Sequence, residues 1–276
     1  MPRLNLAINS PMLWNHPVDR AAALAAEFGF SGIEVWVEHI RFYDTPLPKL
    51  AAAVKSHGLR LTLHAPSWDL NLCALNENIR HQSLQEIRKA IRIAAELQAA
   101  DLTVHPGRAT LPQPWHPLHH QIMAQAFLSL AEQADSLGVT LSIELMEPIK
   151  GELITEPAAL NALLAKLPPT VKTTLDVAHL RRESDFQPYL ATLQRINKIH
   201  FSDRSPAAYH LPPGSGMFDC RRLLKEALAT GIPIVLEGFD SSPEHSLIHA
   251  HLEFIRADSR PPASLEEVNS AADNAG

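Results

Sequence analysis

The segments LTLHAP, at residues 61–66, and LTVHPG, at residues 102–107, follow one pattern. In each, apolar residues alternate with a threonine, as in a β-strand, and the run reaches a histidine with a proline one or two residues later. Because proline cannot donate a hydrogen bond to a sheet, the two strands are predicted to end close to His64 and His105. Two such endings raise the question whether other strands end on similar side chains.

Six further short segments have the composition of buried strands, and segments of helical periodicity separate all eight. The predicted strands span 4–9, 32–36, 60–65, 101–105, 139–145, 172–177, 197–202 and 233–239. The predicted helices span 17–28, 46–57, 78–99, 116–137, 155–166, 183–194, 217–230 and 243–257. Eight strands, each followed by a helix, predict a single (β/α)₈ TIM barrel over residues 1–257.

Two other features bear on this fold. A doubly wound α/β sheet is the alternative, but the first strand is not followed by a glycine-rich dinucleotide-binding turn. The last segment, residues 258–276, is rich in Pro, Ser, Ala and Asn and has no periodicity. We expect it to be a disordered tail.

The composition narrows the class of protein. Apolar residues make up 46% of the chain and charged residues 20%, as in soluble globular proteins with a large core. The sequence has no apolar run long enough to cross a membrane, and its first residues lack the pattern of a signal peptide. Its two cysteines, Cys73 and Cys220, are too few for a disulfide framework, which favours the cytoplasm. The net charge of −6 argues weakly against non-specific nucleic-acid binding.

The other predicted strands also end near side chains that bind metals. In a (β/α)₈ barrel the C-terminal ends of the strands converge on one mouth, where catalytic groups lie. Glu34 lies near the end of the second strand. The later strand ends and the loops just beyond them carry His64, His105, Glu144, Asp176, His179, His200, His210 and Glu237.

Any one of these residues is compatible with an ordinary packing or ion-pair role. Together, however, carboxylates and imidazoles in one cavity would repel one another or lose their solvation. A divalent cation removes this conflict, because neutral imidazole nitrogens and ionised carboxylate oxygens bind it together. The sequence therefore predicts a metal site, for which Zn²⁺, Mn²⁺ and Co²⁺ are all suitable ions.

With these residues in place, the sequence resembles the xylose isomerase-like TIM barrels, a superfamily that includes D-tagatose 3-epimerase, inosose-type isomerases and dehydratases, and endonuclease IV. The resemblance extends to about residue 257, and DVAH at 176–179 and HFSD at 200–203 are similar to motifs of this superfamily. It implies that one metal ion is held by the four residues that match the epimerase ligands. These are Glu144, Asp176, His200 and Glu237.

Endonuclease IV extends this site, and the resemblance to it implies further ligands. His64 and His105 match its histidines on the third and fourth strands, and the HPG of 105–107 occurs there too. His179 and His210, with GSG at 214–216, match its third-metal site, but Ala208 replaces the aspartate of that site. We therefore expect two divalent ions bridged by Glu144, with a third ion in doubt.

The first functional hypothesis is an isomerase or epimerase of a small sugar, keto-sugar or sugar phosphate, acting through a metal-stabilised enediolate. The resemblance makes Glu144 and Glu237 the acid/base pair. The expected substrate contacts are Glu34, Trp36, Trp68, Glu147, His179 and Arg204. Trp36 and Trp68 would stack on a sugar ring or simply cover the mouth. Glu34 would touch the substrate or support a ligand from behind. A homo-oligomer is compatible with the sequence.

The second hypothesis is a metal-dependent phosphodiesterase similar to endonuclease IV, acting on abasic DNA. The histidines that match that enzyme favour it, and Arg41, Phe42 and Tyr43 offer a grip on nucleic acid. Against it stand the acidic net charge, Ala208 and the absence of an evident basic strip. A binding module without catalysis is a third hypothesis, which the complete ligand set disfavours. We expect the isomerase or epimerase.

Overall fold

Eight parallel strands close into a barrel in chain order, β1 next to β2 and β8 next to β1. The computed structural model describes residues 4–258. The strands are β1 (Leu4–Asn9), β2 (Phe30–Trp36), β3 (Arg60–His64), β4 (Leu102–Val104), β5 (Leu141–Glu144), β6 (Lys172–Asp176), β7 (Ile196–Phe201) and β8 (Ile234–Leu236). The predicted (β/α)₈ barrel is therefore confirmed. The predicted tail, apart from Asp258, lies outside the described residues.

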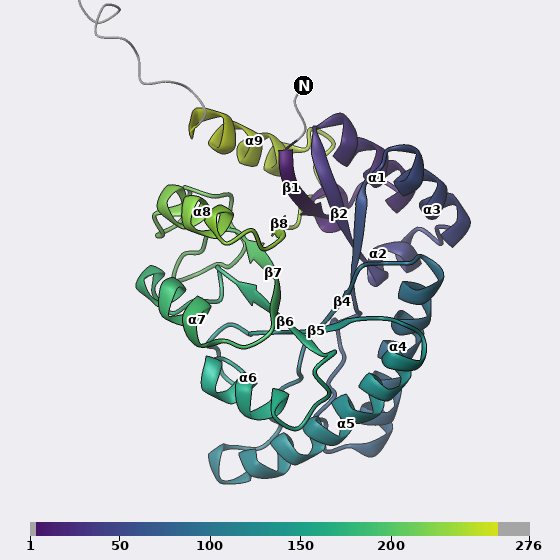
Figure 1. Cartoon of the computed structure of the whole chain (residues 1–276), viewed down its shortest axis with the longest axis vertical. Helices are drawn as coiled ribbons and strands as arrows, with labels where there is room; N and C mark the ends of the chain where they lie inside the picture. The colour runs from purple at the N-terminus through teal and green to yellow at the C-terminus, as the bar shows by residue number, and fades with distance from the viewer. Residues whose placement is uncertain (1–3, 259–276) are drawn as a thin grey trace, which may run out of the picture.

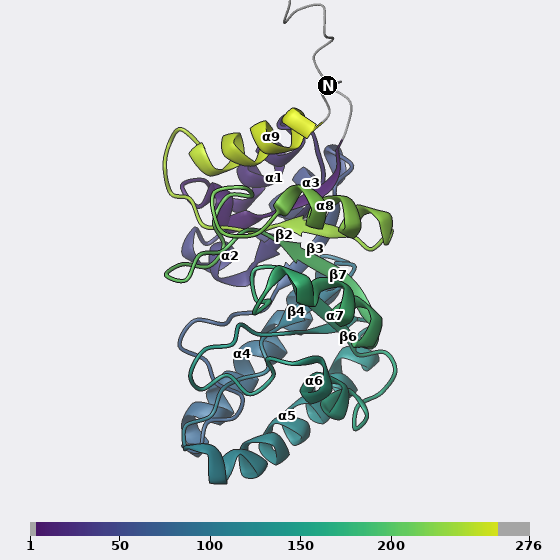
Figure 2. The same cartoon turned by 90° about the vertical axis from the view of Figure 1, so that its left-hand side faces the viewer.

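Helices surround the barrel, and Figures 1 and 2 show them placed around its circumference. They are α1 (Val18–Glu27), α2 (Val37–Phe42), α3 (Leu47–Ser56), α4 (Glu77–Glu96), α5 (His116–Ser136), α6 (Pro157–Leu164), α7 (Phe186–Thr192), α8 (Cys220–Ala229) and α9 (Ser246–Asp258). Short 3₁₀ helices are η1 (Ser10–Leu13), η2 (Gln113–Trp115) and η3 (Glu183–Asp185). Among residues 4–258, none of the helices has both the length and the apolar character that a bilayer span requires.

The helix α2 was not predicted. It begins directly after β2 and has only six residues, too few for a 3.6-residue period to stand out from the preceding strand. Its N-cap residue, Trp36, has extended backbone and no side-chain capping bond, so the usual polar start signal is missing. Its residues Arg41 and Phe42 enter the sequence analysis only through the phosphodiesterase hypothesis, as a grip on nucleic acid.

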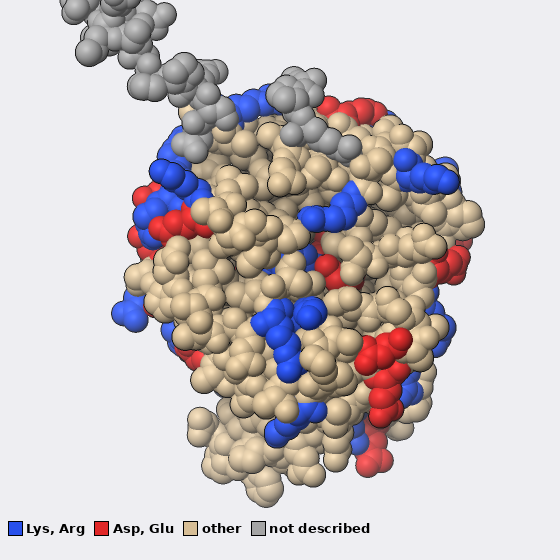
Figure 3. Space-filling view, viewed as in Figure 1, with Lys and Arg blue, Asp and Glu red and all other residues tan. Residues whose placement is uncertain are grey.

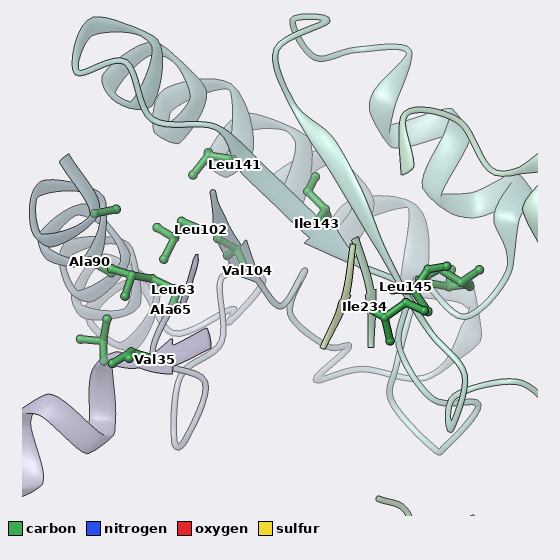
Figure 4. Packing of buried hydrophobic residues seen from close by; sticks show 14 of the residues in the cluster. Val35, Leu63, Ala65, Ala90, Leu102, Val104, Leu141, Ile143, Leu145 and Ile234 are labelled. Carbon is green, nitrogen blue, oxygen red and sulfur yellow. The ribbon is translucent and has the colours of Figure 1, made fainter. Parts of the chain in front are cut away.

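The strands place their apolar and polar residues on opposite sides of the barrel wall. Side chains alternate along a strand, and in β3 and β4 the aliphatic residues belong to the hydrophobic core between the strands and the helices. Figure 4 shows Leu63 and Leu102 packed near Ala90 of α4. The intervening residues, such as Thr62, Thr103 and His64, are buried and polar. The alternation of residues 61–66 and 102–107 thus places apolar side chains on the outside of the barrel and polar side chains on the inside.

Neighbouring residues of α5 test this account of the core. Phe127 is fully buried, whereas Leu128 is 40% exposed. We expect Phe127→Ala to lower the free energy of unfolding by about 3–5 kcal/mol, because it removes buried apolar contacts and leaves a cavity. Leu128→Ala should change it by less than about 0.5 kcal/mol. Urea unfolding monitored by circular dichroism measures both, and equal losses would contradict the assignment of the buried face.

Candidate metal centre

The structure brings all eight predicted ligands together at the C-terminal ends of the strands, in three overlapping groups. Within each group, one possible ligand atom per residue lies within 4.8 Å of the others. The groups are Glu144, Asp176, His200 and Glu237; His64, His105 and Glu144; and Asp176, His179 and His210. Glu144 belongs to the first two groups and Asp176 to the first and third. This sharing is what a cluster of bridged ions requires.

The central group fits a cation because its polar atoms lack other partners. Oε2 of Glu144, Oδ2 of Asp176, Oε2 of Glu237 and Nδ1 of His200 are all buried without a hydrogen-bond partner in the described part of the chain. Unpaired buried polar atoms are costly, and each normally has an explanation such as a bound ion. Imidazole nitrogen with carboxylate oxygen is a donor set suited to Zn²⁺, Mn²⁺ or Co²⁺.

Two histidines of the outer groups have one ring nitrogen anchored to the backbone. His64 Nδ1 lies 2.8 Å from the carbonyl oxygen of Ala65, and His179 Nδ1 lies 2.9 Å from that of Leu145. A carbonyl only accepts, so each Nδ1 carries a proton, and in the neutral ring the lone pair is then on Nε2. His64 Nε2 then faces Glu144 Oε2 at 3.5 Å, which is the orientation expected of a metal ligand.

The ionisation of the ligands reflects their crowding. Burial alone would raise the pKa of Glu144, but His200 and His105 hold that pKa well below its usual value. Burial also opposes protonation of His200, yet Glu237, Glu34 and Glu144 raise the pKa of its ring well above the usual value. Without a cation, protons on the histidines therefore supply the positive charge of the site. A metal ion would have to displace them.

Glu34 lies below this cluster, inside the barrel. It is fully buried, and its carboxylate pairs with the ammonium group of Lys198 from β7. Its other oxygen, Oε1, lies 2.9 Å from Nε2 of His200. Of the two expected roles for Glu34, this position favours support of a ligand from behind.

Two cavities open beside the ligands, separated by Trp36 and Trp68. One has a volume of about 480 Å³ and reaches His105 and Glu147. The other, of about 300 Å³, reaches His210 and Glu237. Both tryptophans line both cavities.

Trp36 stacks on His64 with ring centroids 4.4 Å apart, and Trp68 is 47% exposed. Glu147 Oε2 lies 3.5 Å from Nε2 of His179. The structure thus places Trp36, Trp68 and Glu147 beside the ligands.

Two of the arginines considered above, Arg204 and Arg41, are engaged with the protein. The Nη1 atom of Arg204 donates to the carbonyl oxygen of Leu180 at 3.0 Å, and its guanidinium lies over the ring of Tyr209. Arg204 does not line either of the two cavities beside the ligands. Arg41 forms an ion pair with Glu86 at 2.7 Å. Both arginines therefore have structural partners.

Asp203, which the sequence analysis noted only as part of the HFSD motif, organises the loop that carries His210. Its fully buried carboxylate accepts four backbone N–H groups, those of Arg204, Gly214, Gly216 and Phe218. A Cβ atom at position 216 would lie 2.4 Å from Asp203 Oδ1, so glycine is required there. Two backbone hydrogen bonds between Asp203 and Leu211, each 2.9 Å, hold the residue next to His210. The GSG turn is thus explained by its contacts with one carboxylate.

Comparison with known proteins identifies the family. Residues 22–258 match the family model of the xylose isomerase-like TIM barrel. The chain therefore belongs to this family, as its motifs indicated.

Individual relatives within this family differ in activity. The chain is 22% identical over 227 residues to fructoselysine 3-epimerase of Shigella flexneri, covering 78% of this chain and 82% of the relative. It is 25% identical over 240 residues to a probable endonuclease 4 of Mycobacterium bovis, and the match covers 81% of this chain and 90% of the relative. The crystal structure of a D-tagatose 3-epimerase-like protein superposes with a TM-score of 0.75 at 22% identity, covering 98% of this chain and 100% of the other.

We predict that metal affinity rises with pH. Burial lowers the pKa of the His179 ring, but Asp176 and Glu144 more than offset this effect and raise the pKa to about 9. The ring is therefore protonated at neutral pH. A cation that binds Asp176 and Glu144 competes with this proton for the same carboxylates and displaces it. The affinity for Zn²⁺ should therefore increase about tenfold per pH unit for each displaced proton and level off above the pKa. Chelator competition across pH measures it. His179→Gln should reduce the slope by one proton, and a pH-independent affinity would contradict the prediction.

A second prediction concerns the loop from Arg204 to Phe218. Asp203→Asn replaces one acceptor oxygen by an amide that faces backbone N–H groups, so about two of the four hydrogen bonds should be lost. We expect faster amide hydrogen exchange confined to this loop. Asp219→Asn, which changes an exposed residue just beyond it, is the control. Unchanged exchange in Asp203→Asn would show that the carboxylate does not hold the loop.

Proposed function

We propose that the protein is a divalent-metal-dependent isomerase or epimerase acting on a small sugar, keto-sugar or sugar phosphate. The observation that carries the proposal is the central group of Glu144, Asp176, His200 and Glu237, whose unpaired ligand atoms lie beside cavities lined by tryptophan. The similarity to fructoselysine 3-epimerase supports the same reaction class.

The residues divide the chemistry between them. A divalent cation held by the central group would supply Lewis-acid polarisation of a substrate carbonyl and its neighbouring hydroxyl. Glu144 ends β5 and Glu237 directly follows β8, and the two carboxylates would move a proton between the two faces of the adjacent carbon. His179 and Glu147 would hold substrate hydroxyls, since their side chains already lie together at 3.5 Å.

The tryptophans would orient the sugar. Trp36 and Trp68 offer apolar faces to both cavities, and the C–H faces of a sugar pack well on aromatic rings. Trp36 is also stacked on His64, so a sugar resting on it would lie near the ligands. Arg204 is not assigned to the substrate, because its guanidinium is engaged with Leu180 and Tyr209.

A metal-dependent phosphodiesterase similar to endonuclease IV is the second candidate. It is favoured by His64 and His105, which form a second group with Glu144 and are absent from the four-residue epimerase set, and by the similarity to a probable endonuclease 4. Against it, Arg41 is paired with Glu86, and Ala208 stands at the aspartate position. On the face in Figure 3, basic side chains lie in separate groups beside acidic ones, not in one band.

The deciding experiment gives the metal-loaded protein both kinds of substrate. In D₂O with a panel of ketoses, we expect deuterium to enter at the carbon next to the carbonyl, detected by NMR. Glu144→Gln and Glu237→Gln should each slow this exchange by about 100-fold or more, because each removes a proton-transfer group.

Abasic-site duplex DNA provides the second arm. We expect no strand breaks above background. Efficient nicking that His64→Ala abolishes, while His81→Ala on the exposed face of α4 retains it, would overturn the proposal in favour of the phosphodiesterase. Deuterium exchange that persists in Glu144→Gln and Glu237→Gln would contradict the assigned acid/base pair.

A further inference from the structure

A buried lysine lies directly beneath the candidate metal centre. Lys198 of β7 is 1% exposed, and its Nζ lies 2.6 Å from Oδ1 of Asp101 and in contact with Oε2 of Glu34. Because side chains alternate along a strand, Lys198 and His200 point into the same barrel interior, one layer apart. The sequence pattern alone predicts no role for Lys198, which lies near the start of the predicted strand 197–202.

The two oxygens of Glu34 have different partners. Oε2 accepts from Lys198, from Thr62 Oγ1 at 3.2 Å and from Thr103 Oγ1 at 3.4 Å. Oε1 lies 2.9 Å from Nε2 of His200. Neither of these last two atoms has any other hydrogen-bond partner in the described residues. The contact between Oε1 of Glu34 and Nε2 of His200 is therefore the one polar interaction open to these two atoms within the described residues.

The opposite edge of the His200 ring faces the ligands. Its Nδ1 lies 2.9 Å from Oε2 of Glu237 and 3.5 Å from Oε1 of Glu144. A neutral imidazole has one N–H and one lone pair, and only the lone pair binds a metal ion. A carboxylate facing Nε2 accepts a proton from it and cannot donate one. A cation held by Glu237 and Glu144 would need the lone pair on Nδ1, so the N–H would then be on Nε2, where the carboxylate of Glu34 accepts it.

We propose that Glu34, oriented by Lys198, is a positioning residue that fixes the His200 tautomer in which Nδ1 is presented to the cation. Lys198 holds one oxygen of Glu34 and leaves the other for His200. Asp101 holds Lys198 in turn. The inference rests on the proposed metal site, but not on which reaction that site catalyses.

The variant Glu34→Gln tests this orientation. A glutamine amide has one accepting oxygen and one donating NH₂ group, and the ammonium of Lys198 can only donate. The amide oxygen must therefore face Lys198, which turns the NH₂ group toward Nε2 of His200. This arrangement requires the lone pair on Nε2 and moves the N–H to Nδ1. We expect the affinity for Zn²⁺ to fall by about 10- to 100-fold.

A double variant separates this mechanism from simple damage to the core. In Glu34→Gln with Lys198→Met, the amide is free to turn its oxygen toward His200, and Zn²⁺ affinity should recover relative to Glu34→Gln alone. Thr62→Val is the matched control, because it removes a hydrogen bond to Oε2 without changing the atom that faces His200. Its Zn²⁺ affinity should stay close to that of the wild type. A double variant that binds no better than Glu34→Gln would overturn the proposal.

The wild-type protein gives a direct test that does not depend on how the variants fold. In the Zn²⁺-loaded protein, ¹⁵N NMR of His200, assigned from the spectrum of His200→Gln, should show the proton on Nε2 and a coordinating Nδ1. A proton on Nδ1 would refute the proposal. If the protein takes up no Zn²⁺, the proposed metal site fails instead. The positioning role of Glu34 then falls with that site, whereas a proton on Nδ1 in the Zn²⁺-loaded protein overturns this role alone.

Discussion

The mouth of the barrel concentrates more buried ligand groups than the protein itself can pair. Glu144, Asp176 and Glu237 each keep a buried oxygen without a hydrogen-bond partner, and His200 lies between them. In a low-dielectric interior such groups must share protons or a cation. The rest of the site serves this requirement: the backbone carbonyls behind His64 and His179 direct the Nε2 atoms of these rings toward carboxylates of the site, and the tryptophans line the neighbouring cavities.

The alternation within each strand links this cluster to the stability of the fold. The aliphatic residues that point outward hold the helices to the barrel, while the residues between them carry the ligands. A one-residue shift in the pairing of a strand would move its ligand into the apolar layer. The register of strand pairing, which stabilises the barrel, therefore also determines where along the barrel axis each carboxylate and imidazole lies.

Much of this arrangement could be predicted because it depends on local patterns. Each strand with its terminal His, Asp or Glu is a short segment, and the topology of the barrel then brings the ends together. The role of Lys198 could not be predicted, since its partners Glu34 and Asp101 lie on distant strands. Helix α2 lacked both length and a polar cap. Asp203 was seen as a motif residue, but its four N–H partners are spread along a loop without regular structure.

The way in which Asp203 gathers this loop has a consequence for how the family diversifies. Because one carboxylate anchors the backbone at both ends of the loop, the exposed side chains of Pro206 and Ala207 between them are not needed to hold it. Such a segment can accept new side chains, as at position 208, while still delivering His210 to the same place. Substitutions at positions 206 to 208 offer a route to altered selectivity that leaves the barrel undisturbed.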